Sequence, residues 1–171
     1  MKVSEYIARM LEKMNIEHFF AMPGDYNFPL LDAIVARKKL KSVYCSNELN
    51  MAYMADGYAR YNGLAVFSTI ALVGALSAVN GIAGSFAERV PVLHIAGGPR
   101  RIYAIKRRTT HHQLGNSNYT PAVEIYKPIT IYSNIVDSAT DIPKELNKAI
   151  SLMLRHRKPA YLEVPVDILT E

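Results

Sequence analysis

Apolar and polar positions follow two spacings along this chain. Apolar residues recur at helical spacing from Val3 to Met14, with Ser4 as the expected helix cap and Asn15 as the residue that ends the helix. Further helices are predicted over 27–39, 46–63, 73–89 and 141–157, with Asn27 as a cap and prolines 29 and 143 in first turns. Short apolar runs that predict buried strands occupy 18–22, 42–46, 64–69, 90–98, 128–133 and 160–166. The segment 99–121 is predicted to be irregular.

Strands and helices therefore alternate, and the strands are apolar throughout. This pattern predicts an α/β fold with three layers (α/β/α) and a mostly parallel sheet of about six strands covered on both faces. A length of 171 residues suits one domain over 1–171. Such sheets bind ligands at the carboxyl ends of their strands. Four segments lie there: 23–25, 47–48, 69–74 and 97–118.

Composition narrows the class of protein only a little. Half of the residues are hydrophobic and 20% are charged, as in ordinary globular domains. Cys45 is the single cysteine, so no internal disulfide can form, which fits a reducing compartment and a cytoplasmic location. The first residues form an amphipathic stretch with acids, unlike a signal peptide. Serine, asparagine and glycine interrupt the longest apolar run, so no membrane span is expected.

The net charge is +5, and basic residues cluster at 37–41, 99–108 and 155–158. Either these clusters bind nucleic acid or they are solvated loops and helix ends. No aromatic residues alternate with them in the manner of RNA-binding segments. We therefore favour solvated surface and expect no nucleic-acid partner.

Glu48 raises the first chemical question, because it begins the predicted helix 46–63 on its apolar side. Helical spacing from Glu48 leads to Met51, Ala52, Ala55 and Ala59. One interpretation is an acidic residue favoured by the helix macrodipole. The other is a functional carboxylate, since partial burial raises the pKa of a carboxyl and suits it to hold a proton. The helix alone leaves both open.

The second chemical feature is the stretch "TTHHQLGN", in which His111 and His112 are adjacent in a loop. No carboxylate or cysteine stands at ligand spacing beside them, so we expect no metal site. General acid–base chemistry suits histidine, which titrates near neutral pH. A plain pair of surface histidines is the alternative.

Four motifs, in this order and at these separations, carry a family resemblance: "MPGDYNFPLLDAI", "NELNMAYMADGYAR", "LSAVNGIAGSFAE" and "HHQLGN". Together they resemble the N-terminal pyrimidine-binding domain of pyruvate and indolepyruvate decarboxylases, which are thiamine-diphosphate-dependent 2-oxo-acid decarboxylases. The resemblance extends from residue 1 to the end of the chain. The histidine pair is its most specific part, because it separates these enzymes from the related acetolactate synthases.

The resemblance implies residue roles. Glu48 matches the glutamate that hydrogen-bonds the aminopyrimidine ring nitrogen and starts the proton relay that activates the cofactor. Asp25, His111 and His112 match residues that handle protons around the substrate. The cofactor-binding positions implied are Pro23, Gly24, Glu48, Thr69, Leu72 and Gly74, and no metal ligand is implied on this chain.

The resemblance also implies partners. The middle domain and the diphosphate-binding domain, with its Mg²⁺ motif, have no counterpart in the sequence. We therefore expect half a site, completed by a separate diphosphate-binding subunit, a 2-oxo acid as substrate, a homo-oligomer, and no activity from the isolated chain. A small-residue ridge (Gly74, Ala78, Gly81, Ser85) offers a surface for self-association or for packing inside the domain.

The sequence departs from the family pattern between residues 69 and 78. Leu72 stands where a glycine is usual, and Ala75 replaces a glutamate. Leucine there can narrow the cofactor pocket or fill space elsewhere. Two alternatives to a split decarboxylase therefore stay open: a non-catalytic stand-alone module, and a fragment of a full-length enzyme.

Overall fold

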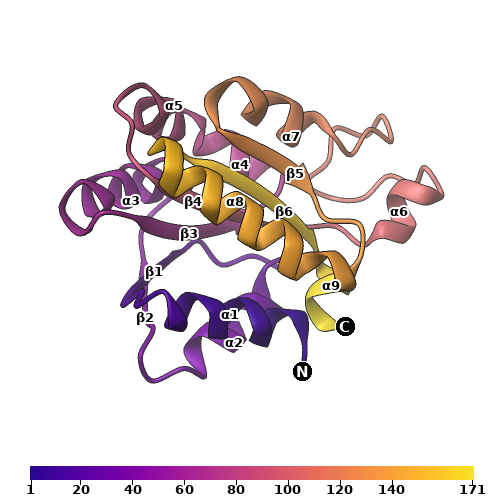
Figure 1. Ribbon diagram of the computed structural model, residues 1–171. Helices are drawn as coiled ribbons and strands as arrows, with labels where there is room; N and C mark the ends of the chain where they lie inside the picture. Colours follow the sequence, from indigo (N-terminus) through magenta and orange to yellow (C-terminus); the bar gives the residue numbers. More distant parts are fainter.

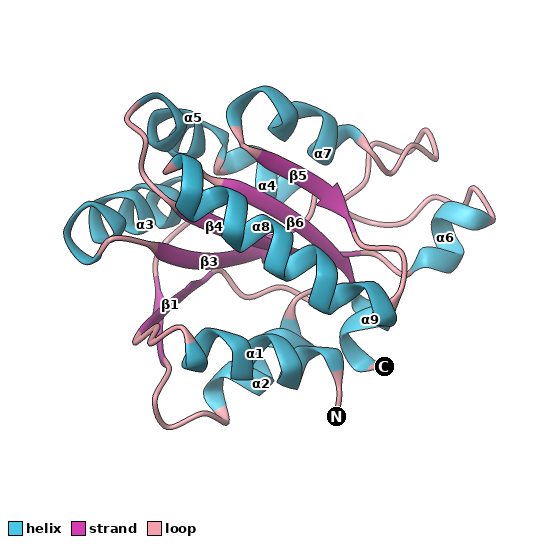
Figure 2. Ribbon diagram, in the orientation of Figure 1, coloured by secondary structure: helices cyan, strands magenta, loops and turns pink.

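The computed structural model describes residues 1–171 and has three layers, with a parallel sheet between two layers of helices (Figures 1 and 2). The strands are β1 (His18–Ala21), β2 (Lys41–Tyr44), β3 (Ala65–Ile70), β4 (Val92–Gly98), β5 (Tyr132–Ile135) and β6 (Ala160–Pro165). Their order in the sheet is β2-β1-β3-β4-β6-β5, and every pair is parallel. The predicted fold class is confirmed.

The helices cover the two faces of the sheet. They are α1 (Val3–Lys13), α2 (Phe28–Val35), α3 (Glu48–Asn62), α4 (Val73–Ser77), α5 (Val79–Ala87), α6 (Arg101–Ile105), α7 (Pro121–Tyr126), α8 (Ile142–His156) and α9 (Val166–Thr170). One core cluster joins the sheet to α1, α2, α8 and α9, and a second joins it to α3, α4, α5 and α7. In Figure 1, α8 crosses in front of the sheet, and α3 and α5 lie behind it. None of these helices is long and apolar enough to cross a membrane.

The central strands explain the continuous apolar runs of the sequence. Every residue of β3, β4 and β6 is buried. Neighbouring side chains point to opposite faces, so Val66 belongs to the first cluster and Phe67 to the second. The edge strands β2 and β5 are only partly buried.

Helix boundaries required three corrections. Helix α1 begins at Val3, and the buried Ser4 lies inside its first turn instead of capping it. The backbone N–H of Lys2 instead donates to the Glu5 carboxylate (3.2 Å). Asn15 follows the helix in a left-handed conformation (φ 58°), as expected of the residue that ends it. Helix α2 ends at Val35, and the predicted helix over 73–89 is broken at Ala78 into α4 and α5.

The second half of the chain differs in more places. The segment 99–121, predicted to be irregular, contains the short helix α6. The predicted strand 128–133 begins late, because Lys127–Ile129 form a 3₁₀ turn in which the Thr130 hydroxyl donates to the Tyr126 carbonyl (2.7 Å). Helices α7 and α9 were not predicted at all. These short elements lack the length over which helical periodicity becomes visible.

The small-residue ridge is used inside the domain. A Cβ added to Gly81 would lie only 2.5 Å from the Cβ of Ala52, so α5 approaches α3 more closely than a side chain would allow. Ser85 strengthens the same contact, since its hydroxyl donates to Asp56 of α3 (2.8 Å). The ridge is therefore no free surface for self-association.

This close approach predicts opposite effects for two glycines of α5. Gly81→Ala should lower the free energy of unfolding by about 1–3 kcal/mol, because the methyl group must displace the α3 backbone. Gly84→Ala should raise it by about 0.5–1 kcal/mol, because the space around Gly84 is open and alanine favours helix. Urea unfolding of both variants measures the difference. Equal effects would mean that α5 does not pack on α3 in this way.

Candidate functional site

The candidate residues collect at one edge of the sheet. Asp25 follows β1, Glu48 opens α3 after β2, the 69–74 segment ends β3, and the histidine pair lies in the loop after β4. Because all the strands are parallel, these four connections emerge at their carboxyl ends. The topology thus places segments that are distant in sequence on the same side of the molecule.

Asp25 and the histidine pair come into direct contact. The Nε2 atom of His111 lies 2.5 Å from Oδ2 of Asp25. One ligand atom from each of Asp25, His111 and His112 lies within 4.8 Å of the others, and all three side chains are exposed. No carboxylate stands beside the pair in the sequence, but the fold brings Asp25 to it from 86 residues away.

Tyr26 joins these residues, although no pattern in the sequence singles it out. Its buried hydroxyl donates to the carbonyl of His111 (3.1 Å) and lies 3.2 Å from the hydroxyl of Thr110. Its ring lies against the His111 ring, with centroids 5.0 Å apart. Burial raises the pKa of Tyr26, so it remains a neutral donor. Tyr26 therefore fixes the histidine loop to the turn that carries Asp25.

The side chain of Asn27 stabilises the turn that carries Asp25. It precedes α2, as predicted, but its side chain does not cap the helix. The fully buried amide oxygen accepts from the Gly24 N–H (2.9 Å), and the amide nitrogen donates to the Met22 carbonyl (3.1 Å) and to Ser68 Oγ (3.0 Å). Asn27 thus anchors the Pro23-Gly24-Asp25 turn to β3, which leaves Asp25 in a defined position.

Glu48 lies where the sequence placed it, at the head of the apolar stripe of α3. Met51, Ala52, Ala55 and Ala59 are fully buried. The helix is capped by Asn47, whose side chain accepts from the Asn50 N–H (2.9 Å). The half-buried Glu48 carboxylate makes no hydrogen bond or ion pair with the protein, so the cap leaves it free for a ligand.

Glycine makes room around Glu48. A Cβ added to Gly74 would lie 3.1 Å from Glu48 Oε1 and 2.9 Å from Cγ1 of Ile70. A Cβ added to Gly24 would lie 2.4 Å from Cγ2 of Ile70. Gly24 and Gly74 therefore both pack closely against Ile70. Gly74 also lies beside the Glu48 carboxylate.

Leu72 and Thr69 point into the core. Leu72 is only 1% exposed and belongs to the second core cluster, so its side chain fills space in the core. Its φ of +55° explains why glycine suits this position, since a leucine there is strained. The buried Thr69 hydroxyl donates to the Ile70 carbonyl (2.8 Å) and contacts Nε2 of His94 (2.9 Å). Complete burial lowers the pKa of His94 to about 3, so this imidazole is neutral.

Comparison with known proteins identifies the class. Residues 1–119 match the family described as the thiamine pyrophosphate enzyme, N-terminal TPP binding domain. The match covers more than half of the chain, and the chain belongs to this family.

Individual relatives agree with this assignment. The chain is 40% identical to a putative pyruvate decarboxylase of Schizosaccharomyces pombe, over 96% of this chain and 29% of that protein. It is 39% identical to the pyruvate decarboxylase of Neurospora crassa, over 97% of this chain and 29% of that protein. It is 35% identical to pyruvate decarboxylase 2 of Nicotiana tabacum, over 97% of this chain and 27% of that protein. The chain thus spans less than a third of the length of these relatives.

The contacts of Tyr26 predict a local effect of removing its hydroxyl. Tyr26→Phe should lower the free energy of unfolding by about 0.5–1.5 kcal/mol, the usual contribution of one hydrogen bond. It should also speed amide hydrogen exchange in the loop around His111, because the loop loses its attachment. Tyr103→Phe is the matched control, since the Tyr103 hydroxyl makes no hydrogen bond to the protein. Unchanged exchange in Tyr26→Phe would contradict the anchoring role.

Proposed function

We propose that this chain is the pyrimidine-binding half of a thiamine-diphosphate-dependent, non-oxidative 2-oxo-acid decarboxylase. The observation that carries the proposal is the convergence of Asp25, His111 and His112 at the sheet edge where the free Glu48 carboxylate also lies. Family membership supports the cofactor, and the similarity to pyruvate decarboxylases supports the reaction.

The residues at this edge fit the pyrimidine half of the cofactor. Glu48 offers a carboxylate without a protein partner, and the absence of a side chain at Gly74 leaves its Oε1 uncovered on that side. Leu72, the residue that departs from the family pattern, is buried in the second core cluster. When bound, thiamine diphosphate supplies the electron sink for the loss of carbon dioxide from a 2-oxo acid.

The chain's own residues would then hold and move protons. Glu48 would keep a proton at the pyrimidine ring nitrogen, beside the apolar surface of Met51 and Ala52. Asp25 contacts Nε2 of His111, and the other ring nitrogen, Nδ1, lies 3.4 Å from the Thr110 hydroxyl, so a proton on the ring would be held between these two partners. His112 adds a second titratable ring, whose centroid lies 4.7 Å from that of His111. Tyr26 would position this pair without reacting.

The proposal includes a completing partner. Asp25, His111 and His112 are exposed, although acid–base groups work best where water is excluded. A diphosphate-binding domain on a separate chain, carrying Mg²⁺, would cover them, and the assembly would contain more than one copy of this chain. The proposal assigns the diphosphate contacts to the partner, because no motif for a metal-bridged diphosphate is found on this chain.

The isolated chain should therefore bind thiamine diphosphate and Mg²⁺ weakly, with a Kd above the micromolar range, and should release no carbon dioxide from pyruvate. Calorimetric titration and a coupled aldehyde assay measure the two quantities. Adding the diphosphate-binding chain that co-purifies with the native protein should restore both. Tight binding or turnover by the isolated chain would show that the site lies elsewhere.

In the completed complex, Glu48→Gln should slow exchange of the thiazolium carbon proton for deuterium, followed by NMR, by about 10²–10⁴-fold. Glutamine keeps the size of the side chain beside Met51, but it cannot relay a proton. Glu124→Gln is the matched control, because Glu124 also lies in the first turn of a helix but is exposed. If Glu48→Gln and Glu124→Gln exchange equally fast, Glu48 is only a helix-end carboxylate.

A further inference from the structure

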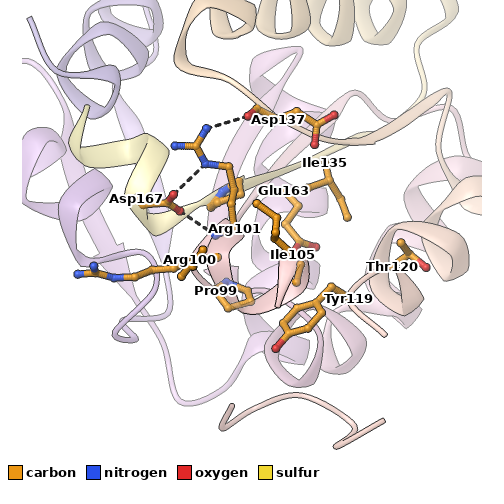
Figure 3. Close-up of a pocket in the computed structure, with 13 residues that line it drawn as sticks. Pro99, Arg100, Arg101, Ile105, Tyr119, Thr120, Ile135, Asp137, Glu163 and Asp167 are labelled. Atoms are coloured by element: carbon orange, nitrogen blue, oxygen red, sulfur yellow. Dashed lines mark hydrogen bonds and ion pairs between the residues drawn. The ribbon is translucent and has the colours of Figure 1, made fainter. Parts of the chain in front are cut away.

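A cavity of about 600 Å³ lies at the carboxyl ends of β4, β5 and β6, beside α6 (Figure 3). It is separate from the candidate site, and the last two residues of β4 divide the two regions. A Cβ on Gly97 would collide with the backbone of Tyr26, whereas a Cβ on Gly98 would collide with the carboxylate of Glu163. The size of the cavity is typical of sites for small molecules.

The walls of the cavity are mainly apolar. Helix α6 buries none of its residues in the core, and its Ile102 and Ile105 line the cavity while remaining 41% and 75% exposed. Ile135 at the end of β5 and Pro165 at the end of β6 complete the apolar lining. A short helix that offers isoleucines to a cavity instead of the core has side chains available for a ligand.

Arg101 attaches α6 to α9 and forms ion pairs there. Its backbone N–H and its Nε donate to the two carboxylate oxygens of Asp167 (3.1 and 2.8 Å). Its guanidinium also pairs with Glu171 and donates to the Asp137 carbonyl (2.9 Å). The cavity therefore has a fixed wall, and the positive charge of Arg101 is already neutralised.

Glu163 is the acidic group of the cavity. It is only 4% exposed, and its Oε2 accepts from the Tyr161 hydroxyl (3.0 Å). Its Oε1 lies beside Gly98 and accepts no hydrogen bond from the protein. Burial raises the pKa of Glu163 to about 7, against the opposing effect of the Tyr161 hydrogen bond. Oε1 is therefore the atom through which Glu163 can accept a hydrogen bond from a ligand in the cavity.

The surrounding charges indicate the sign of the charge that a ligand of this cavity carries. The guanidinium of Arg100 is turned away from Glu163 in Figure 3. The exposed Asp137 carboxylate forms no ion pair, and the charge of Arg101 is paired with Asp167, so Arg100 is the one unpaired cation among the residues that line the cavity. We propose that the cavity is a binding site for a small organic cation, an ammonium group on an apolar body, whose N–H donates to Glu163 Oε1 while the body packs on Ile102 and Ile105.

Three probes built on a phenyl ring and a short alkyl chain test the sign of the charge: 2-phenylethylammonium, 2-phenylethanol and phenylacetate. Titration of the whole chain, followed by NMR shifts of the Gly98 and Ile102 amides, should rank the ammonium first and phenylacetate last. A difference of at least tenfold in Kd between these two is expected at pH 8. Equal affinities, or tighter binding of phenylacetate, would overturn the proposal.

The pH dependence gives a second readout. The titratable groups that contact Glu163 or line the cavity with it are Tyr161 on its own strand, Arg100 and Arg101 at α6, Asp167 on α9, Asp137 after β5 and Tyr119 before α7. The neutral His94 of β4 packs against Tyr161. Glu163 gains its negative charge as the pH rises through about 7, while an alkylammonium stays protonated. Affinity for 2-phenylethylammonium should therefore rise about tenfold from pH 6 to pH 8. A flat or falling profile would contradict the role of Glu163.

Variants separate the cavity from a general effect on the fold. Glu163→Gln should abolish the pH dependence and the preference for the ammonium probe. Ile102→Ala should weaken that probe at least threefold, whereas Ile125→Ala of α7, also at 41% exposure but outside the cavity, should leave it unchanged. Should Glu163→Gln fail to fold, the isoleucine pair still decides, because equal effects of the two substitutions would overturn the proposal.

Discussion

The constraint on which this structure depends is the burial of a parallel sheet on both faces. The central strands β3, β4 and β6 have no exposed residue, so most of their side chains pack in the core. Two core clusters of 25 and 19 buried residues lie on the two sides of the sheet. Polar chemistry is thereby displaced to the strand ends, where connections leave the sheet and water or a ligand can enter.

The end of β4 shows how closely two regions of that edge are packed. Gly97 allows the backbone of Tyr26 to approach from one side, and Gly98 allows Glu163 to approach from the other. Tyr26 belongs to the cluster with Asp25 and His111, whereas Glu163 belongs to the cavity beside α6. Two adjacent glycines thus serve two different regions, because successive residues of a strand face opposite sides.

The candidate site could be predicted in part. Glu48 and the histidine pair are visible in the sequence because their residue types conflict with the local pattern: an acid on an apolar stripe, and two imidazoles in a turn-rich loop. The pairing of Asp25 with His111 could not be deduced from spacing, since 86 residues separate them. Tyr26 and Asn27 look like ordinary residues of a turn, and their roles depend on Thr110, His111 and Ser68, which only the fold brings near.

The sequence by itself determined the alternation of strands and helices, because hydrophobic periodicity is a local property that each segment carries in its own residues. It also determined that the strands would be parallel and doubly covered, and that Glu48 would stand at the head of the α3 stripe. Only the tertiary structure decided that Leu72 is buried in the core with a positive φ and that the small-residue ridge packs against α3. It also decided that Glu163 is buried with one carboxylate oxygen that accepts no hydrogen bond from the protein. These outcomes depend on which distant surfaces occupy the same space, and no single stretch of the chain contains that information.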